Sequence, residues 1–135
     1  MVLPILAGAA LGAAFALLAR RSADETRMLA LGLLVAALVY VGLALAAGEG
    51  RWLGIEVTGA AVFAGAAWLG HRRPGWLALG WTAHVGWDVW LHLDRAQPLV
   101  GAWYPLLCVG FDLIVAGVLV ALALPPGAPR PSRLV

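Results

Sequence analysis

The stretch MLALGLLVAALVYVGLALAA, which runs from Met28 to Ala47, decides the fold class of this chain. Its twenty residues carry no charge, and about 20 consecutive apolar residues are what an α-helix needs to cross the hydrocarbon core of a bilayer. Arg27 precedes the stretch and Gly48 follows it, so a charged residue and a helix-ending residue mark its two boundaries. The sequence therefore predicts a transmembrane helix over residues 28–47.

Four further apolar stretches of comparable length lie on either side of this one, at residues 2–18, 52–69, 76–93 and 99–124. Short segments that contain charged residues, Gly or Pro separate them, as expected for the connections of a helical bundle. We expect an all-α polytopic transmembrane bundle of about five spans, in which residues 1–124 form a single domain. Residues 125–135 are expected to form a Pro/Arg-rich tail, because the prolines exclude a continuous helix.

The composition of the whole chain is typical of a membrane protein. Of its 135 residues 63% are hydrophobic and only 12% are charged, and the mean hydropathy is +0.92, whereas soluble domains carry about 25% charged residues. The net charge of +2 comes from Arg residues that are spread over the connections and the tail, so no basic patch points to a nucleic-acid partner. The expected partner is the lipid bilayer of the cell membrane, crossed several times.

The distribution of arginine predicts the orientation of the spans. Seven of the nine Arg fall in the first connection, the third connection and the tail, and two fall in the second and fourth connections. Positive charge is enriched in the cytoplasmic loops of membrane proteins. The sequence therefore predicts an N-terminus outside and a tail in the cytoplasm. The seven are Arg20, Arg21, Arg27, Arg72, Arg73, Arg130 and Arg133, and the two are Arg51 and Arg95.

Four ionisable side chains lie inside the predicted spans: Glu56, His84, Asp88 and Asp112. A charged group in hydrocarbon costs about 3 kcal/mol or more unless it has a polar partner, so these side chains are expected to point into the bundle. In the fourth span, His84, Asp88 and His92 recur every four residues and therefore share one helix face. We expect Asp88 to pair with His84. The expected complementary acid is Glu56 or Asp112. The helix that carries Asp112 offers this residue no cationic neighbour.

The spacing of the histidines argues against a metal site on this helix alone. A rise of about 1.5 Å per residue separates His84 from His92 by about 12 Å, which is too far for both to bind one ion. The same rise gives each polar residue a depth below the predicted outer face. Glu56 lies at about 6 Å and Asp88 at about 7 to 8 Å. His84 lies deeper, at about 13 Å, and Asp112 at about 13 to 20 Å. Three helices thus offer polar groups to the outer half of the membrane, and the pattern identifies no metal or other cofactor.

Four further residues are candidates for contacting a substrate. Trp81 and Trp87 flank the polar stripe, His92 ends its span close to water, and Cys108 precedes Asp112 by one helical turn. Aromatic faces beside one or two acids suit carbocation and isomerisation chemistry in an apolar cavity. Because Cys108 is the only cysteine, the sequence excludes a disulfide framework and a Cys-x-x-Cys site.

Gly8 and Gly12 form a Gly-x-x-x-Gly spacing in the first span. Such a spacing lets another helix approach closely. The approaching helix belongs either to the same bundle or to a second copy in a homo-oligomer, and packing within the bundle is the favoured interpretation.

The segment from Gly80 to His92, with two later residues, resembles an uncharacterised family of small bacterial polytopic membrane proteins, a domain of unknown function. The resemblance implies a polytopic membrane protein and no known activity. The family pattern often has a second His where this chain has Leu91, so a role that needs adjacent histidines is not implied here. The residues that carry the resemblance are Gly80, Trp81, His84, Trp87, Asp88, His92, Cys108 and Asp112.

Three functions are compatible with these residues. The leading hypothesis is a membrane-embedded acid/base enzyme, of isomerase, cyclase or hydrolase type, that acts on a lipophilic small molecule. Its catalytic residues would be His84, Asp88, Asp112 and Glu56. The second hypothesis is a structural or accessory subunit in which the polar groups clamp helices together. The third is a proton or cation pathway, or a metal- or heme-binding protein, although a pathway needs polar groups in both halves of the membrane and the inner half is apolar.

Overall fold

The computed structural model describes residues 2–93 and 99–123, and the regular structure within these ranges is helical throughout. This confirms the all-α bundle that the sequence predicts. The expected tail at residues 125–135 and the fourth connection at residues 94–98 lie outside the described residues. The helices are α1 (Val2–Arg21), α2 (Glu25–Ala47), α3 (Gly50–Gly70), α4 (Pro74–Trp87), its π-helical continuation η1 (Asp88–Leu93), and α5 (Trp103–Ala123).

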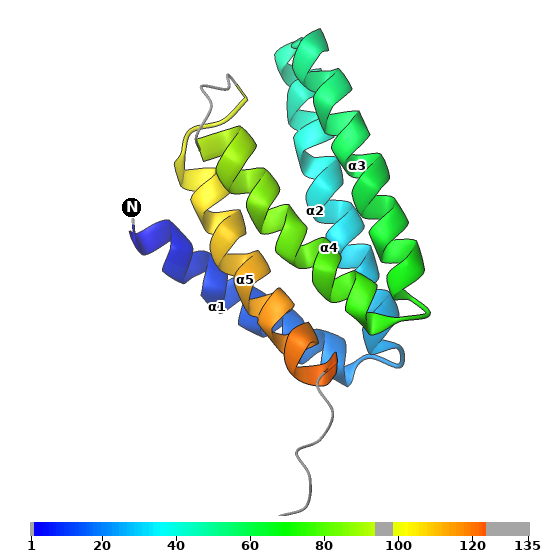
Figure 1. Ribbon diagram of the computed structural model, residues 1–135. Coiled ribbons are helices and arrows are strands. Elements are labelled where there is room, and N and C mark those ends of the chain that lie inside the picture. The colour runs from blue at the N-terminus through cyan, green and yellow to red at the C-terminus, as the bar shows by residue number, and fades with distance from the viewer. Residues whose placement is uncertain (1, 94–98, 124–135) are drawn as a thin grey trace, which may run out of the picture.

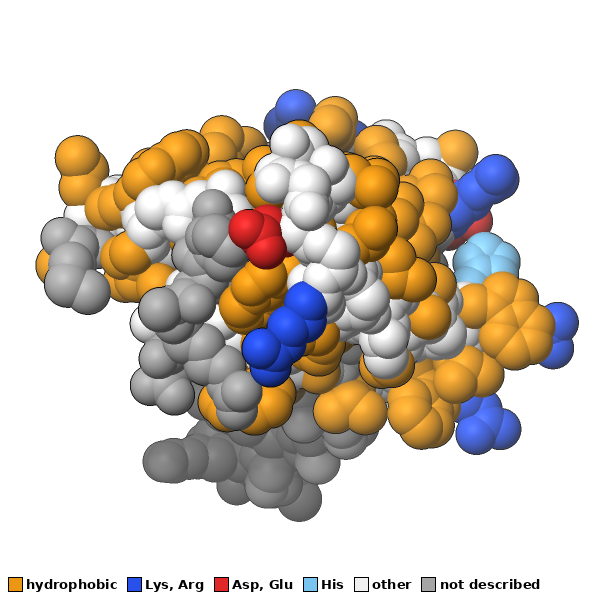
Figure 2. Space-filling model, turned by 90° about the horizontal axis from the view of Figure 1, so that it is seen from above, with side chains coloured by type: hydrophobic (Ala, Val, Ile, Leu, Met, Phe, Trp, Pro, Cys, Tyr) orange, Lys and Arg blue, Asp and Glu red, His pale blue; other side chains and the backbone are white. Residues whose placement is uncertain are grey.

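Four of these helices, α1, α2, α3 and α5, are long and apolar enough to cross a membrane. The fourth expected span consists of α4 and η1, which cover residues 74–93 without interruption. Large hydrophobic side chains such as Leu3, Val35 and Val62 are exposed on the outside of the bundle. Figure 2 shows hydrophobic side chains over much of the surface seen from the end where α2 connects to α3. The protein is therefore a helical membrane protein, and the orientation of its termini stays a prediction.

Local sequence sets the helix ends close to their expected positions. Asp24 caps α2, because its side chain accepts the backbone N–H of Arg27 at 2.9 Å. Gly48 ends the same helix with a φ of 68°, a left-handed conformation that glycine adopts without strain. Pro74 occupies the first turn of α4, where its missing N–H costs no hydrogen bond.

The last helix is shorter than the sequence predicts. The expected span begins at residue 99, whereas α5 begins at Trp103. This later start puts Pro105 into the first turn, where proline removes no hydrogen bond that the helix needs. The proline therefore favours a helix that begins just before it.

Close backbone contact joins α1 to α5 along their length (Figure 1). A Cβ atom at Gly12 would lie 2.6 Å from the carbonyl oxygen of Phe111, and one at Gly8 would overlap the carbonyl group of Leu107. Gly110 of α5 faces the backbone of α1 just as closely. The Gly-x-x-x-Gly spacing thus serves packing within the bundle, as the favoured interpretation predicts.

The central element is α4, which lies between the α1/α5 pair and the α2/α3 pair (Figure 1). Its N-terminal half is part of the apolar core, and its C-terminal half with η1 carries the buried polar residues. Polar and apolar cores therefore occupy opposite halves of the bundle, as the sequence predicts. The larger members of the apolar core are Leu29, Leu33, Phe63, Leu77, Trp81, Val115 and Leu119.

Candidate functional site

The first part of the site is a group of three side chains, His84, Asp88 and Asp112, which we call the His84 cluster. Nδ1 of His84 lies 2.7 Å from Oδ2 of Asp112 and 3.7 Å from Oδ2 of Asp88. Each of the three residues is at most 1% exposed. His84 and Asp88 come from the central helical segment and Asp112 from α5. The expectation that these side chains point into the bundle is confirmed.

The partner of His84 differs from the expected one. Asp112 makes the hydrogen bond to His84, whereas the oxygens of Asp88 make no hydrogen bond of good geometry among the described residues and lie beside Tyr40 and Asp112. A shared helix face brings Asp88 within reach of His84, but the close approach of α5 brings Asp112 nearer. Asp88 also begins the π-helical segment, and such segments are frequent at functional sites.

The second part of the site is a pair formed by Glu56 of α3 and His92 of η1. Nε2 of His92 lies 3.3 Å from Oε1 of Glu56, and Nε1 of Trp87 donates to Oε2 of Glu56 at 3.2 Å. Gly59 makes room for Trp87, because a Cβ at this glycine would lie 2.5 Å from the indole ring. His92 is buried, so the expectation that it lies close to water is wrong. The reason is that α2 and α3 extend beyond η1 at this end of the bundle (Figure 1).

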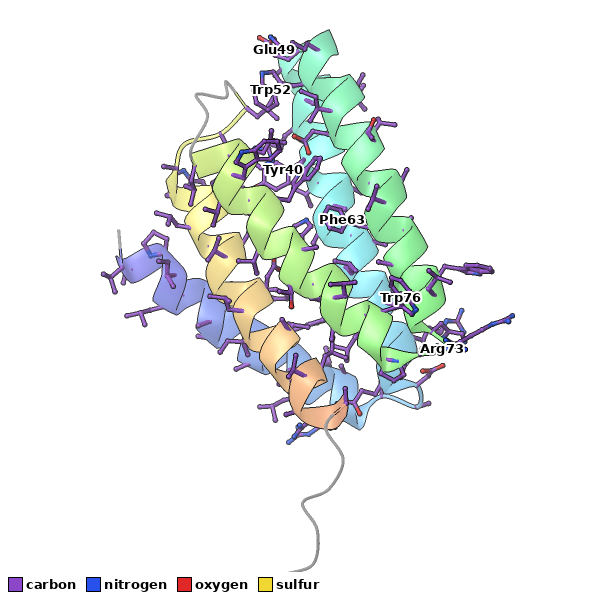
Figure 3. The ribbon with its side chains drawn as sticks, viewed as in Figure 1. Tyr40, Glu49, Trp52, Phe63, Arg73 and Trp76 are labelled. Atoms are coloured by element: carbon purple, nitrogen blue, oxygen red, sulfur yellow. The ribbon has the colours of Figure 1, made fainter. Side chains whose placement is uncertain are left out.

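Tyr40 of α2 belongs to the site although the sequence analysis missed it. Its ring stacks on the imidazole of His92, with the ring centroids 3.8 Å apart, and the ring of Trp52 lies 6.3 Å from the same imidazole. Figure 3 shows Tyr40 and Trp52 toward the end of the bundle where Glu49 lies. The buried hydroxyl of Tyr40 makes no hydrogen bond of good geometry among the described residues, but it lies beside the carboxyl group of Asp88. A tyrosine inside an apolar span could have indicated a site residue from the sequence, because a buried tyrosine hydroxyl usually forms a hydrogen bond with a polar group.

The two remaining candidates occupy different surroundings. Trp81 is fully buried in the apolar core, where its ring packs against Phe15 and its Nε1 donates to the carbonyl oxygen of Leu29 at 3.2 Å. Cys108 is half-buried on α5, one turn before Asp112. A substrate-binding role for Trp81, Trp87, His92 or Cys108 stays a prediction.

An apolar cavity of about 290 Å³ lies between α3 and α4. Phe63 forms part of its wall, and the ring of Phe63 also lies edge-on to His84, with the centroids 4.8 Å apart. The same ring contacts Trp87 edge-on at 5.8 Å. Val62 and Leu79, which also line the cavity, are exposed on the outside of the bundle. Phe63 therefore stands between this cavity and the His84 cluster.

The three residues of the His84 cluster lie close enough together to hold a metal ion. One ligand atom from each residue can be chosen so that all three atoms lie within 4.8 Å of one another. These residues come from two helical segments. The separation of about 12 Å that prevents His84 and His92 from sharing an ion therefore does not limit the His84 cluster.

Residues 1–124 match the model of a family described as a family of unknown function, DUF6010. The chain belongs to this family. The match of DUF6010 spans every helix and both parts of the site, and it confirms the resemblance to an uncharacterised family. No curated protein and no solved structure matches the chain. Membership of DUF6010 carries no activity with it, so the function has to follow from the site.

Proposed function

We propose that this DUF6010 protein is a membrane-embedded enzyme that performs acid/base chemistry on a lipophilic small molecule. The main support is the 2.7 Å contact between His84 and Asp112, which is buried beside the carboxylate of Asp88. A carboxylate bonded to Nδ1 holds an imidazole in a fixed orientation. A buried carboxylate that makes no hydrogen bond of good geometry lowers the stability of the fold. Residues that lower stability in this way are expected at functional sites.

The proposed roles follow from the hydrogen bonds. Asp112 orients His84 through Nδ1, which leaves the buried and unpartnered Nε2 atom for proton exchange. Asp88 is the second acid/base group, because it is buried beside His84 and its oxygens make no hydrogen bond of good geometry within the described residues. Glu56, held by Trp87 and His92, is a further acid in the other part of the site. Isomerisation, cyclisation and hydrolysis all require one group that removes a proton and another that supplies one.

The apolar cavity between α3 and α4 supports a lipophilic substrate. Its walls are apolar, and the exposure of Val62 and Leu79 beside it indicates access from the acyl chains rather than from water. A volume of 290 Å³ is at the lower end for ligand pockets, which start at about 300 Å³, so it suits part of a lipid chain. Phe63 lines this cavity and its ring also contacts His84, with the centroids 4.8 Å apart, so a chain bound in the cavity would lie one side chain away from the His84 cluster.

The proposal can be tested on membrane lipids without knowing the substrate. The protein is reconstituted into nanodiscs that contain the lipid extract of the expression host, incubated in D₂O, and the lipids are compared by mass spectrometry with those of empty nanodiscs. We expect at least one lipid species to gain deuterium or to change in mass. This change should be absent with Asp88→Asn and Asp112→Asn. It should persist with Trp68→Phe, because Trp68 is an exposed residue near the other end of α3.

The opposite result would favour an accessory subunit. If no lipid species changes in the presence of the wild-type protein, the enzyme proposal is refuted. If both Asn variants also unfold at a clearly lower temperature, the His84 cluster serves to clamp α4 to α5. Removing one partner of a buried ion pair typically costs about 3 to 5 kcal/mol, which a melting curve in detergent detects.

A further inference from the structure

The charges of the His84 cluster do not balance. Asp88 and Asp112 bring two carboxylates, and within the described residues His84 is the basic side chain that contacts them. The described Arg residues all lie in connections or in the terminal turns of helices. Even with a protonated imidazole, two ionised carboxylates leave one negative charge in the interior of the bundle. An uncompensated charge at such a place is strongly unfavourable.

A proton on Asp88 is one way to balance the charge. Neither Asp88 oxygen makes a hydrogen bond of good geometry within residues 2–93 and 99–123, although the carboxyl group of Asp112 lies beside it and would accept a proton shared between the two acids. A cation between the three side chains would take lone pairs from both carboxylates and from the imidazole at once, in place of the hydrogen bond between His84 and Asp112. A divalent cation would balance this charge, and residues 2–93 and 99–123 supply no basic side chain other than His84 to the two carboxylates.

We propose that the His84 cluster binds one divalent transition-metal ion through Nδ1 of His84 and one oxygen each of Asp88 and Asp112. The inference rests on the proposed function, since it names the cofactor of the same site. In the metal-bound protein the ion would replace the hydrogen bond between Nδ1 of His84 and Asp112, and Asp88 and Asp112 would be ligands, which leaves Nε2 of His84 for proton exchange. Ligand atoms bound at about 2.0 to 2.2 Å from an ion lie about 3.0 to 3.5 Å from one another. The distances of 2.7 and 3.7 Å from Nδ1 to the two carboxylates lie on either side of this range, and all three ligand atoms lie within 4.8 Å of one another, so the side chains would have to shift to coordinate an ion.

The donor set indicates the class of ion. One imidazole nitrogen and two carboxylate oxygens suit ions of the Zn²⁺, Mn²⁺ and Fe²⁺ type, whereas Cu⁺ prefers sulfur ligands. Three protein ligands leave at least one coordination position open, which is the arrangement of catalytic rather than structural sites. A divalent ion at this place would act as a Lewis acid and make a bound water more acidic, in keeping with acid/base chemistry.

Metal binding is measured without any substrate. The protein is purified in detergent with an affinity tag that contains no histidine, and its metal content is determined by inductively coupled plasma mass spectrometry. After chelation, Zn²⁺ is titrated back by calorimetry. We expect about one ion per chain and an affinity for Asp88→Asn that is lower by at least about tenfold. His71→Gln is the matched control, because it removes an exposed histidine that follows α3 and should leave the affinity unchanged.

Thermal unfolding of the wild-type protein provides a second measurement that does not depend on the folding of a variant. Zn²⁺ should raise the midpoint of unfolding of the wild-type and the His71→Gln proteins, because a ligand that binds only the folded state stabilises it. A wild-type protein that contains no metal, and whose midpoint Zn²⁺ leaves unchanged, would overturn the metal site.

The lipid assay separates this inference from the proposed function. Lipid conversion by the chelated, metal-free protein would overturn the metal cofactor and leave the enzyme. Binding of one Zn²⁺ by the His84 cluster, with no lipid conversion in the presence of Zn²⁺ or Mn²⁺, would support the metal site and refute the enzyme.

Discussion

The rings of Tyr40 and His92 are stacked, with their centroids 3.8 Å apart and their planes at an angle of 4°. The stack joins α2 to η1, and Glu56 of α3 lies 3.3 Å from the same imidazole. His92 therefore fixes the central helical segment to the α2/α3 pair. His84 fixes it to α5 on the other side, so the two histidines hold the two halves of the bundle around the site.

The stack predicts different effects for two substitutions of Tyr40. Tyr40→Phe keeps the ring and removes a hydroxyl that makes no hydrogen bond of good geometry, so the free energy of unfolding should change by less than about 1 kcal/mol. Tyr40→Leu removes the aromatic face and should lower the free energy of unfolding by about 1 to 3 kcal/mol. Unfolding in mixed SDS micelles, followed by circular dichroism, measures both. Equal losses for the two variants would contradict the importance of the stack.

The two aspartates of the His84 cluster should respond in opposite directions when replaced by leucine in the metal-free protein. Asp112→Leu leaves Nδ1 of His84 without its partner and should lower the free energy of unfolding by about 1 to 3 kcal/mol. Asp88→Leu removes one of two buried carboxylates that share a single imidazole and should raise it by a similar amount. Melting curves after chelation test this pair. A loss of stability on Asp88→Leu would argue that Asp88 is a structural residue.

The close contact between α1 and α5 predicts that the stability of the fold depends strongly on Gly12. Gly12→Ala would place a Cβ atom 2.6 Å from a backbone oxygen of α5, so the helices must separate, at an expected cost of about 1 to 3 kcal/mol. Gly42→Ala is the control, because no atom lies within 4 Å of the added Cβ, and Ala in a helix is favoured over Gly by about 0.5 to 1 kcal/mol. The same SDS unfolding measurement applies. Similar effects at both glycines would be inconsistent with this contact.

The distribution of Arg predicts which ends of the helices face the cytoplasm. In a Cys108→Ser background, a single cysteine at Gly48 should react with a membrane-impermeant maleimide added to intact cells. Cysteines at Ala23 and Arg73 should react only after the cells are opened, because the connections that contain them are rich in Arg. The reverse labelling pattern would invert the orientation, and the site would then lie in the cytoplasmic half of the membrane.

Several features of the fold follow from local sequence alone. The uncharged run from Met28 to Ala47 forms most of α2, and Asp24, Gly48 and Pro74 set helix ends through their own backbone and side-chain chemistry. The spacing of four residues also places His84 and Asp88 on one face of the central segment. Such features depend on neighbours along the chain, so a single sequence is sufficient to predict them.

The contacts within the site depend on the tertiary structure. The helical period gives the face on which a side chain lies, but not the rotation and depth of the helix that packs against that face. Close packing along α5 decides that Asp112, and not Asp88, is the hydrogen-bond partner of His84. The length of α2 beyond η1 decides that His92 is covered by Tyr40 instead of facing water. The sequence by itself thus determined the spans and the polar residues of this protein, whereas the packing between helices decided which of these residues meet.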